Sequence, residues 1–351
     1  MPKDFLYDHE SIFLNDVALS YDFIPKEIPH RENEHHYIAT CIKPLFENRN
    51  GKNLFIFGPP GIGKTLAIKS ILKELEETSD EIIPIYINSW KHDTSHKILL
   101  EICNLIGYKF VQDKSSNEIM QEIKKILNKK SLVFCFDEID KLTNYDILYF
   151  ILEDIYRKTI ILITNEKSWA NALDLRLKSR LYPELLEFRP YSYEETLDIL
   201  KQRLEYTFVP NVFEKNCLDE IAKKTFELGD IRAGIYLLKE SGEQAESRSS
   251  KKIILQDVEN AIKKLTEFKI KSSKDLDIEQ IELLNLVKAN SGKSASEIYK
   301  LYNKDISYKT FRRRLESLQD AKQINLEEKR KGNQGKITYV YFGVSKKLSE
   351  F

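Results

Sequence analysis

The segment GPPGIGKT at residues 58–65 constrains the fold of this chain more than any other stretch of the sequence. It fits the pattern G-x-x-x-x-G-K-[ST] and lies between an apolar run at residues 53–57 and an amphipathic stretch at residues 64–77. A glycine-rich turn between a buried strand and a helix lets backbone N–H groups surround phosphate oxygens, and the start of the helix favours a bound anion. The sequence therefore predicts a phosphate-binding loop, the P-loop, in an α/β fold.

Each part of this loop has an expected task in binding ATP or ADP. The glycines let the backbone curl around the phosphates, Lys64 is expected to reach the β- and γ-phosphates, and Thr65 is expected to ligate Mg²⁺. The residues predicted to contact the nucleotide here are Gly58, Pro59, Pro60, Gly61, Ile62, Gly63, Lys64 and Thr65.

A carboxylate pair and an amide follow two later apolar runs. Asp137 and Glu138 end the run at residues 132–136, and Asn165 ends the run at residues 159–164. Asp137 is expected to hold Mg²⁺ through water and Glu138 to polarise the attacking water, since phosphoryl transfer depends mostly on positioning and charge stabilisation. Asn165 is placed to orient that water. An acidic pair after a strand also serves as a helix cap, but behind a complete P-loop the catalytic interpretation is favoured.

The order of apolar runs predicts the fold class. Four runs are expected to form buried strands, at residues 53–57, 82–88, 132–136 and 159–164. Runs that are apolar on both faces and are separated by helical patterns predict a parallel sheet covered on both sides. From Ser192, which forms a capping box with Glu195, the pattern is wholly helical to about residue 270.

The remainder of the chain has a different pattern. A polar linker precedes residues 275–351, where three helical stretches lead to two strand-like runs that flank a turn at Gly332–Gly335. The neutral net charge, 55 basic against 55 acidic residues, conceals a basic C-terminal part. Residues 271–351 hold 17 Lys and Arg against 11 Asp and Glu, a net charge of +6, which leaves −6 for residues 1–270. A basic domain is typical of a protein that binds a polyanion.

Composition excludes several classes of protein. Hydrophobic residues make up 42% of the chain, as in soluble globular proteins and unlike disordered ones. The four cysteines, which stand far apart, predict neither a zinc ribbon nor a disulfide framework, so a reducing, cytoplasmic setting is expected. Apolar runs fall short of the roughly 20 residues that a membrane-spanning helix needs, so we expect no membrane partner.

Three consecutive arginines lie in the predicted helix SYKTFRRRLESLQD. Phe311, Leu315 and Leu318 are spaced to form one apolar face, Ser307 can cap the helix, and Arg314 flanks the face. A charge run on a helix is often a solvated surface. A basic helix that follows two others and precedes a basic hairpin, however, is typical of a domain that reads a DNA groove. The residues predicted to contact DNA are Lys309, Arg312 and Arg313 of the helix and Lys331 and Lys336 of the hairpin.

Six stretches carry a resemblance to a known family: YDFIPKEIPHRENE, GPPGIGKT, FDEID, ITNEKSW, LDLRLKSRLYPELLEFRPY and GDIRAGIYLLKESGEQAE. Together they resemble the archaeal origin-recognition and cell-division-control family of AAA+ replication initiators, over nearly the whole chain. The resemblance implies an AAA+ ATP-binding base with a P-loop and parallel sheet at residues 1–190. It also implies a helical lid at 191–270 and a C-terminal winged-helix domain at 275–351.

The resemblance also implies roles for individual residues. Asn165 is the expected sensor 1, and Arg232 is the expected sensor 2, contributed by the lid. Arg180 is the expected finger that reaches the nucleotide of a neighbouring subunit, with Arg176 as the alternative. A helical insertion at Tyr108–Lys125 is expected to touch DNA. The residues expected near the adenine are Ile24, Pro25, His30 and Arg31.

The leading interpretation is an ATP-dependent DNA replication initiator that binds double-stranded origin DNA in the cytoplasm, in association with the nucleoid. Slow ATP hydrolysis to ADP and phosphate is expected to act as a switch, and the replicative helicase and further copies of the chain are its expected partners. The alternative is a nucleotide-binding and DNA-binding regulator or partition factor without initiator activity. A clamp-loader subunit is disfavoured by the predicted winged helix.

Overall fold

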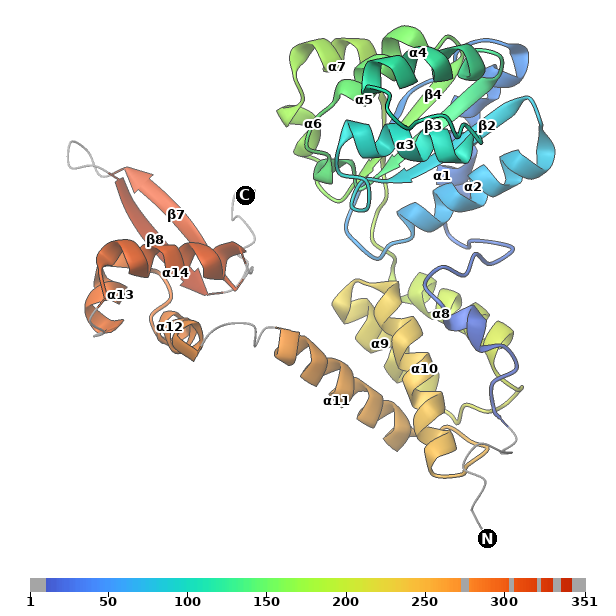
Figure 1. The fold of residues 1–351 in the computed structure, drawn as a ribbon. Coiled ribbons are helices and arrows are strands. Elements are labelled where there is room, and N and C mark those ends of the chain that lie inside the picture. The colour runs from blue at the N-terminus through green and yellow to red at the C-terminus, as the bar shows by residue number, and fades with distance from the viewer. Residues whose placement is uncertain (1–10, 273–277, 303–305, 321–322, 331–335, 343–351) are drawn as a thin grey trace. The chain divides into compact units, whose positions relative to one another are not determined.

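A computed structural model describes residues 11–272, 278–302, 306–320, 323–330 and 336–342 of the chain (Figure 1). The chain divides into two compact units, Met1–Ile262 and Lys263–Phe351. Within the described ranges, no helix is both long and apolar enough to cross a membrane.

The first unit is built on a five-stranded parallel sheet with the strand order β2-β3-β4-β1-β5. Its strands are β1 (Leu54–Phe57), β2 (Ile82–Asn88), β3 (Ser131–Asp137), β4 (Lys158–Thr164) and β5 (Glu184–Glu187). The four strands predicted from apolar runs are confirmed. β5 has no counterpart in the prediction, because it is a short edge strand whose side chains alternate between half-buried and exposed, with Leu185 at 61% exposure.

Helices cover both faces of this sheet, as the apolar strands predict (Figure 1). One face packs against α1 (Glu32–Ile42) and α2 (Lys64–Thr78). The other face packs against α3 (Ser95–Leu105), α4 (Ser116–Leu127), α5 (Asp146–Asp154), α6 (Trp169–Ala172) and α7 (Leu175–Leu181). Short 3₁₀ helices are η1 (Asp16–Leu19), η2 (Lys43–Glu47) and η3 (Ile139–Lys141).

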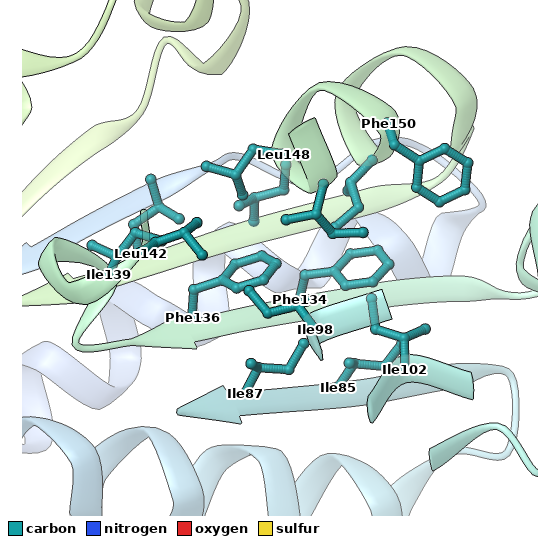
Figure 2. Close-up of a cluster of buried hydrophobic side chains, with 14 of the residues drawn as sticks. Ile85, Ile87, Ile98, Ile102, Phe134, Phe136, Ile139, Leu142, Leu148 and Phe150 are labelled. Carbon is teal, nitrogen blue, oxygen red and sulfur yellow. The ribbon is translucent and has the colours of Figure 1, made fainter. Parts of the chain in front are cut away.

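Figure 2 shows the core on the second face. Phe134 and Phe136 of β3 stack with their ring centroids 6.4 Å apart, and isoleucines of β2 and α3 surround them (Figure 2). Every side chain of β3 is buried, because this strand lies inside the sheet between β2 and β4. Because this core is closely packed, the sheet holds the polar residues at its carboxyl edge in fixed positions.

The chain is wholly helical from α8 to α11. These helices are α8 (Tyr193–Thr207), α9 (Cys217–Leu228), α10 (Ile231–Ser247) and α11 (Leu255–Ser272), whose residues from Lys263 on belong to the second unit. The predicted capping box at the start of α8 is confirmed, because Ser192 Oγ accepts from the Glu195 N–H and the Glu195 carboxylate accepts from the Ser192 N–H. The N-terminal segment packs on the end of this helix, where the Leu14 N–H donates to Thr207 O at 2.7 Å.

The second unit combines helices with a small antiparallel sheet. Its elements are α12 (Ile278–Ala289), β6 (Lys293–Ser294), α13 (Ala295–Tyr302), α14 (Tyr308–Asp320), β7 (Ile324–Arg330) and β8 (Lys336–Phe342). The strands form an antiparallel sheet in the order β6-β8-β7, which confirms the predicted hairpin strands. The predicted turn at Gly332–Gly335 and Lys331 lie outside the described residues, and Lys336 is the first residue of β8.

Candidate nucleotide-binding and DNA-binding sites

The parallel strands bring the P-loop and the later polar positions to one edge of the sheet. β1 and β4 pair so that Phe57 lies opposite Thr164, and β2 and β3 pair so that Asn88 lies opposite Asp137. Since β1 and β4 end side by side, the P-loop that follows β1 and Asn165 that follows β4 lie at the same edge of the sheet. This edge, at the carboxyl ends of parallel strands, is where open α/β sheets bind ligands.

The ammonium group of Lys64 lies inside the loop. Its Nζ donates to Gly58 O at 2.8 Å, to Pro59 O at 2.7 Å and to Asn165 Oδ1 at 2.8 Å. The side chain is 6% exposed, and burial lowers the pKa of Lys64 to about 8, against the opposing effect of Asp137. A buried cation whose hydrogen-bond partners are neutral oxygens is well placed to attract phosphate oxygens.

Two glycines of the loop are required by its backbone. Gly63 precedes α2 with a φ of +87°, in the left-handed region that favours glycine. A Cβ at Gly58 would fall 2.4 Å from the carbonyl oxygen of Phe188, so this backbone passes too close to its neighbour for any side chain.

The buried carboxylate of Asp137 accepts hydrogen bonds from two hydroxyl groups. Thr65 Oγ1 donates to its Oδ2 at 2.6 Å, and the Tyr86 hydroxyl donates to the same oxygen at 2.8 Å. Burial and the Asp137 charge raise the pKa of Tyr86 well above its usual range. Sequence reasoning missed Tyr86, although a hydroxyl-bearing residue within the apolar run of β2 was a signal. The cluster offers the oxygen donors that Mg²⁺ prefers.

Glu138 follows Asp137 and faces the same cavity. Burial raises the pKa of Glu138, and the neighbouring Asp137 and Asp140 raise it further. Asp140 is held in place by Thr164, whose hydroxyl donates to Asp140 Oδ1 at 2.8 Å. A carboxylate whose protonated form is favoured by its neighbours has the property expected of a group that accepts a proton during catalysis.

The lid contributes Arg232 to this edge. Its side chain is 53% exposed, and its Nε and Nη2 each donate to the Asp230 carboxylate at 3.0 Å. The positive charge of Arg232 is close enough to lower the pKa of both Lys64 and Glu138. A charge on α10 therefore affects the pKa of two residues beside the P-loop.

These groups line one cavity of about 430 Å³. Of the residues predicted for the nucleotide or for catalysis, the cavity is lined by Pro25, Pro60, Gly61, Gly63, Lys64, Thr65, Asp137, Glu138, Asn165 and Arg232. It is not lined by Ile24, His30, Arg31, Gly58, Pro59, Ile62 or Arg180. Lining residues that the sequence did not predict include Tyr86, Asn88, Lys91, Tyr191, Gln202 and Arg203.

Arg31 is hydrogen-bonded to the backbone of the P-loop. It is fully buried, and its Nη2 donates to Ile62 O at 3.2 Å and to Arg189 O at 2.7 Å. Its Nε donates to the Tyr191 hydroxyl at 3.1 Å. Arg31 therefore ties the start of α1 to the P-loop and to the segment that leads from β5 to the lid.

The two candidate finger arginines lie on α7. Arg180 forms an ion pair with Glu153 of α5, and its side chain is 47% exposed. Arg176 and Arg180 line a second cavity together with residues of α3, α4 and α5. The structure does not bring either arginine to the nucleotide cavity of its own chain.

The predicted recognition helix is α14. Phe311, Leu315 and Leu318 are buried in the core of the second unit, which confirms the predicted apolar face. Lys309 and Arg313 are exposed, as expected for side chains on the opposite side.

The neighbouring arginines have other surroundings. Arg312 pairs with Glu316 through an Nε–Oε1 distance of 3.3 Å, and Arg314 Nη1 donates to the Tyr302 hydroxyl at 3.2 Å. Arg314 is thus bound to the domain core, while Arg312 has an acidic neighbour on its own helix.

The predicted insertion at Tyr108–Lys125 comprises a loop and most of α4. Lys114 Nζ donates to the Tyr108 hydroxyl at 2.8 Å, and Phe110 is 75% exposed beside the Tyr108 ring. The apolar stripe of α4, which includes Ile119 and Ile123, packs into the sheet core. The loop therefore presents an aromatic ring and basic groups on the surface of the base.

A P-loop sheet whose helical lid supplies an arginine to the same cavity defines the class: the chain is an AAA+ ATPase. Family models match residues 48–167 as an AAA domain and residues 197–263 as a Cdc6 AAA+ ATPase-type lid domain. The chain belongs to the family of ORC1-type DNA replication proteins. It is 30% identical over 355 residues to ORC1-type DNA replication protein 2 of Methanothermobacter thermautotrophicus, covering 95% of this chain and 92% of that protein.

Other relatives agree with this assignment. ORC1-type DNA replication protein 1 of Sulfurisphaera tokodaii is 35% identical over 263 residues, covering 71% of this chain and 66% of that protein. The Aeropyrum pernix ORC1 protein, solved in complex with DNA, has the same fold, with a TM-score of 0.73 at 24% identity. That match covers 95% of this chain and 94% of the solved chain. The family resemblance seen in the sequence motifs is confirmed.

Proposed function

We propose that this chain is an ATP-dependent DNA replication initiator in which nucleotide bound between base and lid controls DNA binding. The observation that carries the proposal is that Lys64, Asp137, Asn165 and Arg232 line one cavity. They come from the P-loop, β3, the end of β4 and α10, so a nucleotide in this cavity contacts base and lid together. Such a ligand stabilises the lid position in which all its contacts are made.

Mg²⁺ fits the oxygen donors beside the P-loop. The Thr65 hydroxyl and the buried Asp137 carboxylate lie 2.6 Å apart, and Mg²⁺ in nucleotide sites is held by one or two such groups together with phosphate oxygens. We assign Thr65 and Asp137 as the ligands from this chain, with Asp137 acting through water. When bound, the ion supplies positive charge that stabilises the transferring phosphoryl group.

Glu138 and Asn165 are assigned to hydrolysis. Glu138 polarises the attacking water, and its raised pKa suits it to accept a proton. Asn165 orients the same water beside Lys64, to which it is hydrogen-bonded. We infer a slow ATPase, because an initiator needs a persistent ATP-bound state more than a high rate.

We assign DNA binding to two surfaces of the chain. On α14, the exposed Lys309 and Arg313 face base edges, and Arg312 joins them by exchanging its Glu316 partner for DNA. The hairpin residues Lys331 and Lys336 bind phosphates or the minor groove. The net charge of +6 in residues 271–351 supports this assignment.

The second DNA surface is the insertion at Tyr108–Lys125, where Phe110 and Lys109 are exposed and Lys114 lies against the Tyr108 ring. We also propose that the ATP-binding base spans residues 1–190, the helical lid residues 191–270 and the winged-helix domain residues 275–351. Self-assembly on DNA would bring Arg180, or Arg176 in its place, to the nucleotide of a neighbouring copy. Recruitment of the replicative helicase and location at the nucleoid in the cytoplasm complete the proposed role.

The proposal is tested by ATP titration together with DNA protection. An initiator binds ATP and protects repeated sites near its own gene. Protection of a single promoter without such repeats favours the regulator or partition factor instead. Failure of the purified chain to bind ATP or ADP contradicts the nucleotide-dependent part of the proposal.

A further inference from the structure

Asp230 and Arg232 form a closed ion pair at the start of α10. Arg232 donates from Nε to Oδ1 and from Nη2 to Oδ2, both at 3.0 Å, so the carboxylate holds the guanidinium through two parallel bonds. Oδ1 also accepts the backbone N–H of Arg232 at 2.9 Å, which makes Asp230 the N-cap of the helix. Asp230 thus fixes both the helix start and the direction of the Arg232 side chain.

The same carboxylate lies directly against the P-loop. A Cβ built at Gly61 would fall 2.0 Å from Asp230 Oδ1, so the lid turn packs where any side chain at Gly61 would stand. The Ile231 N–H donates to Gly61 O at 3.1 Å, which fastens this turn to the loop. Asp230 therefore places a negative charge beside a loop built to receive phosphate oxygens.

We propose that Asp230 is a positioning residue that competes with the terminal phosphate of ATP for Arg232 and thereby sets the preference of the site for ATP over ADP. The inference rests on the proposed ATP-binding function and deepens it.

The competition follows from the geometry of the guanidinium. Arg232 lines the cavity with its side chain 53% exposed, so it can turn toward a bound nucleotide. Asp230 engages Nε and Nη2 and offsets the guanidinium charge, so Arg232 offers its full charge and all of its donors to a phosphate only when it leaves this carboxylate. ATP offers a γ-phosphate as the new partner, and ADP does not. The ion pair therefore opposes ATP binding specifically, whereas charge repulsion by Asp230 opposes both nucleotides.

The test compares ATP and ADP affinities in charge-removing variants. Asp230→Asn keeps a good N-cap but removes the carboxylate charge, and Asp230→Ser keeps a cap without an amide that could hold Arg232. Fluorescent ATP and ADP analogues are titrated into the full chain. In both variants we expect the ratio of the ADP dissociation constant to the ATP dissociation constant to rise about threefold, the size expected for a partly exposed ion pair. In an Arg232→Ala background, the Asp230 substitutions should leave this ratio unchanged, because the competing group is gone.

A matched control lies elsewhere in the lid. Arg248 holds Asp257 in the same bidentate manner, with distances of 2.9 and 2.7 Å, and neither residue lines the nucleotide cavity. Asp257→Asn should therefore lower the melting temperature without changing the nucleotide ratio. An unchanged ratio in both Asp230 variants, in a protein whose wild type binds ATP, overturns the inference and leaves the proposed function standing. A wild type that binds neither nucleotide overturns both.

Discussion

The ammonium nitrogen of Lys64 donates a hydrogen bond to Oδ1 of Asn165 over 2.8 Å, although the two residues stand 101 positions apart in the chain. The contact exists because β1 and β4 are parallel neighbours, so the P-loop and the end of β4 meet at one edge of the sheet. Asn165 therefore touches the charge that is expected to meet the terminal phosphate. When Lys64 exchanges this hydrogen bond for one to a phosphate, Asn165 loses its contact with the lysine.

Lys64→Ala should weaken ATP binding by more than about a hundredfold, because it removes a buried charge at the phosphate site. Titration with a fluorescent ATP analogue measures the loss. Lys69→Ala is the matched control, since Lys69 also lines the cavity but pairs with Asp22 at 3.6 Å. Retention of wild-type affinity by Lys64→Ala would remove the P-loop assignment.

The ATP affinity should depend on pH through Lys64. The pKa of this lysine is lowered to about 8, and bound phosphates raise it again, so ATP binding takes up a proton above pH 8. Affinity should be flat below about pH 8 and fall by up to about tenfold per pH unit above it. Lys64→Arg should abolish this slope, because arginine stays charged. A flat wild-type profile from pH 8 to 10 contradicts the prediction.

Glu138→Gln should bind ATP as the wild type does but hydrolyse it about a hundredfold more slowly, since only the water-polarising carboxylate is lost. Phosphate release measures the rate. Because the pKa of Glu138 is raised, wild-type hydrolysis should decline on acidification at a higher pH than an ordinary glutamate would give. An unchanged rate in Glu138→Gln shows that another group activates the water.

Arg180→Ala should leave ATP binding intact and slow hydrolysis only at protein concentrations where subunits associate, because a finger acts on a neighbouring nucleotide. ATPase rates measured against protein concentration for the wild type, Arg180→Ala and Arg176→Ala distinguish the two arginines. Glu153→Ala is informative, since it frees Arg180 from its ion pair within the subunit. If the Arg180→Ala curve coincides with the wild-type curve throughout, Arg180 has only its structural contact with Glu153.

The sequence was sufficient to predict the elements whose signal is local. β1 to β4 are apolar runs, and the P-loop, Asp137 and Asn165 stand directly after three of them. Parallel strands then bring these positions together without further information. β5 escaped prediction because four residues at a sheet edge carry too little apolar pattern to be distinguished from a loop.

Contacts between distant segments were not predictable from local patterns. The hydrogen bond from the buried Arg31, a residue expected near the adenine, to Ile62 O is one such contact. The positions of Tyr86 beside Asp137 and of Asp230 against Gly61 likewise depend on strand register and on how the lid packs. A single sequence contains the residue types for such contacts but not the three-dimensional distances.

Arg313→Ala should cost about 1–3 kcal/mol in binding a preferred DNA site and much less in binding scrambled DNA, because Arg313 is assigned to a base edge. Competition binding with labelled duplexes measures the difference. Arg314→Ala is the matched control on the same helix, since Arg314 is hydrogen-bonded to Tyr302 and is not assigned to DNA. Equal losses on both kinds of DNA would reassign Arg313 to a phosphate contact.

The central claim, that the chain is an ATP-dependent initiator that selects origin DNA, is tested most directly by nuclease protection of the DNA that flanks its own gene. The full chain is compared with Lys64→Ala and Arg313→Ala, in the presence of ATP or ADP and across a salt series. The account predicts discrete protected repeats with ATP, weaker protection with ADP and with Lys64→Ala, and loss of the preferred sites with Arg313→Ala. Uniform protection of all DNA at every salt concentration, identical with ATP and ADP, would contradict it.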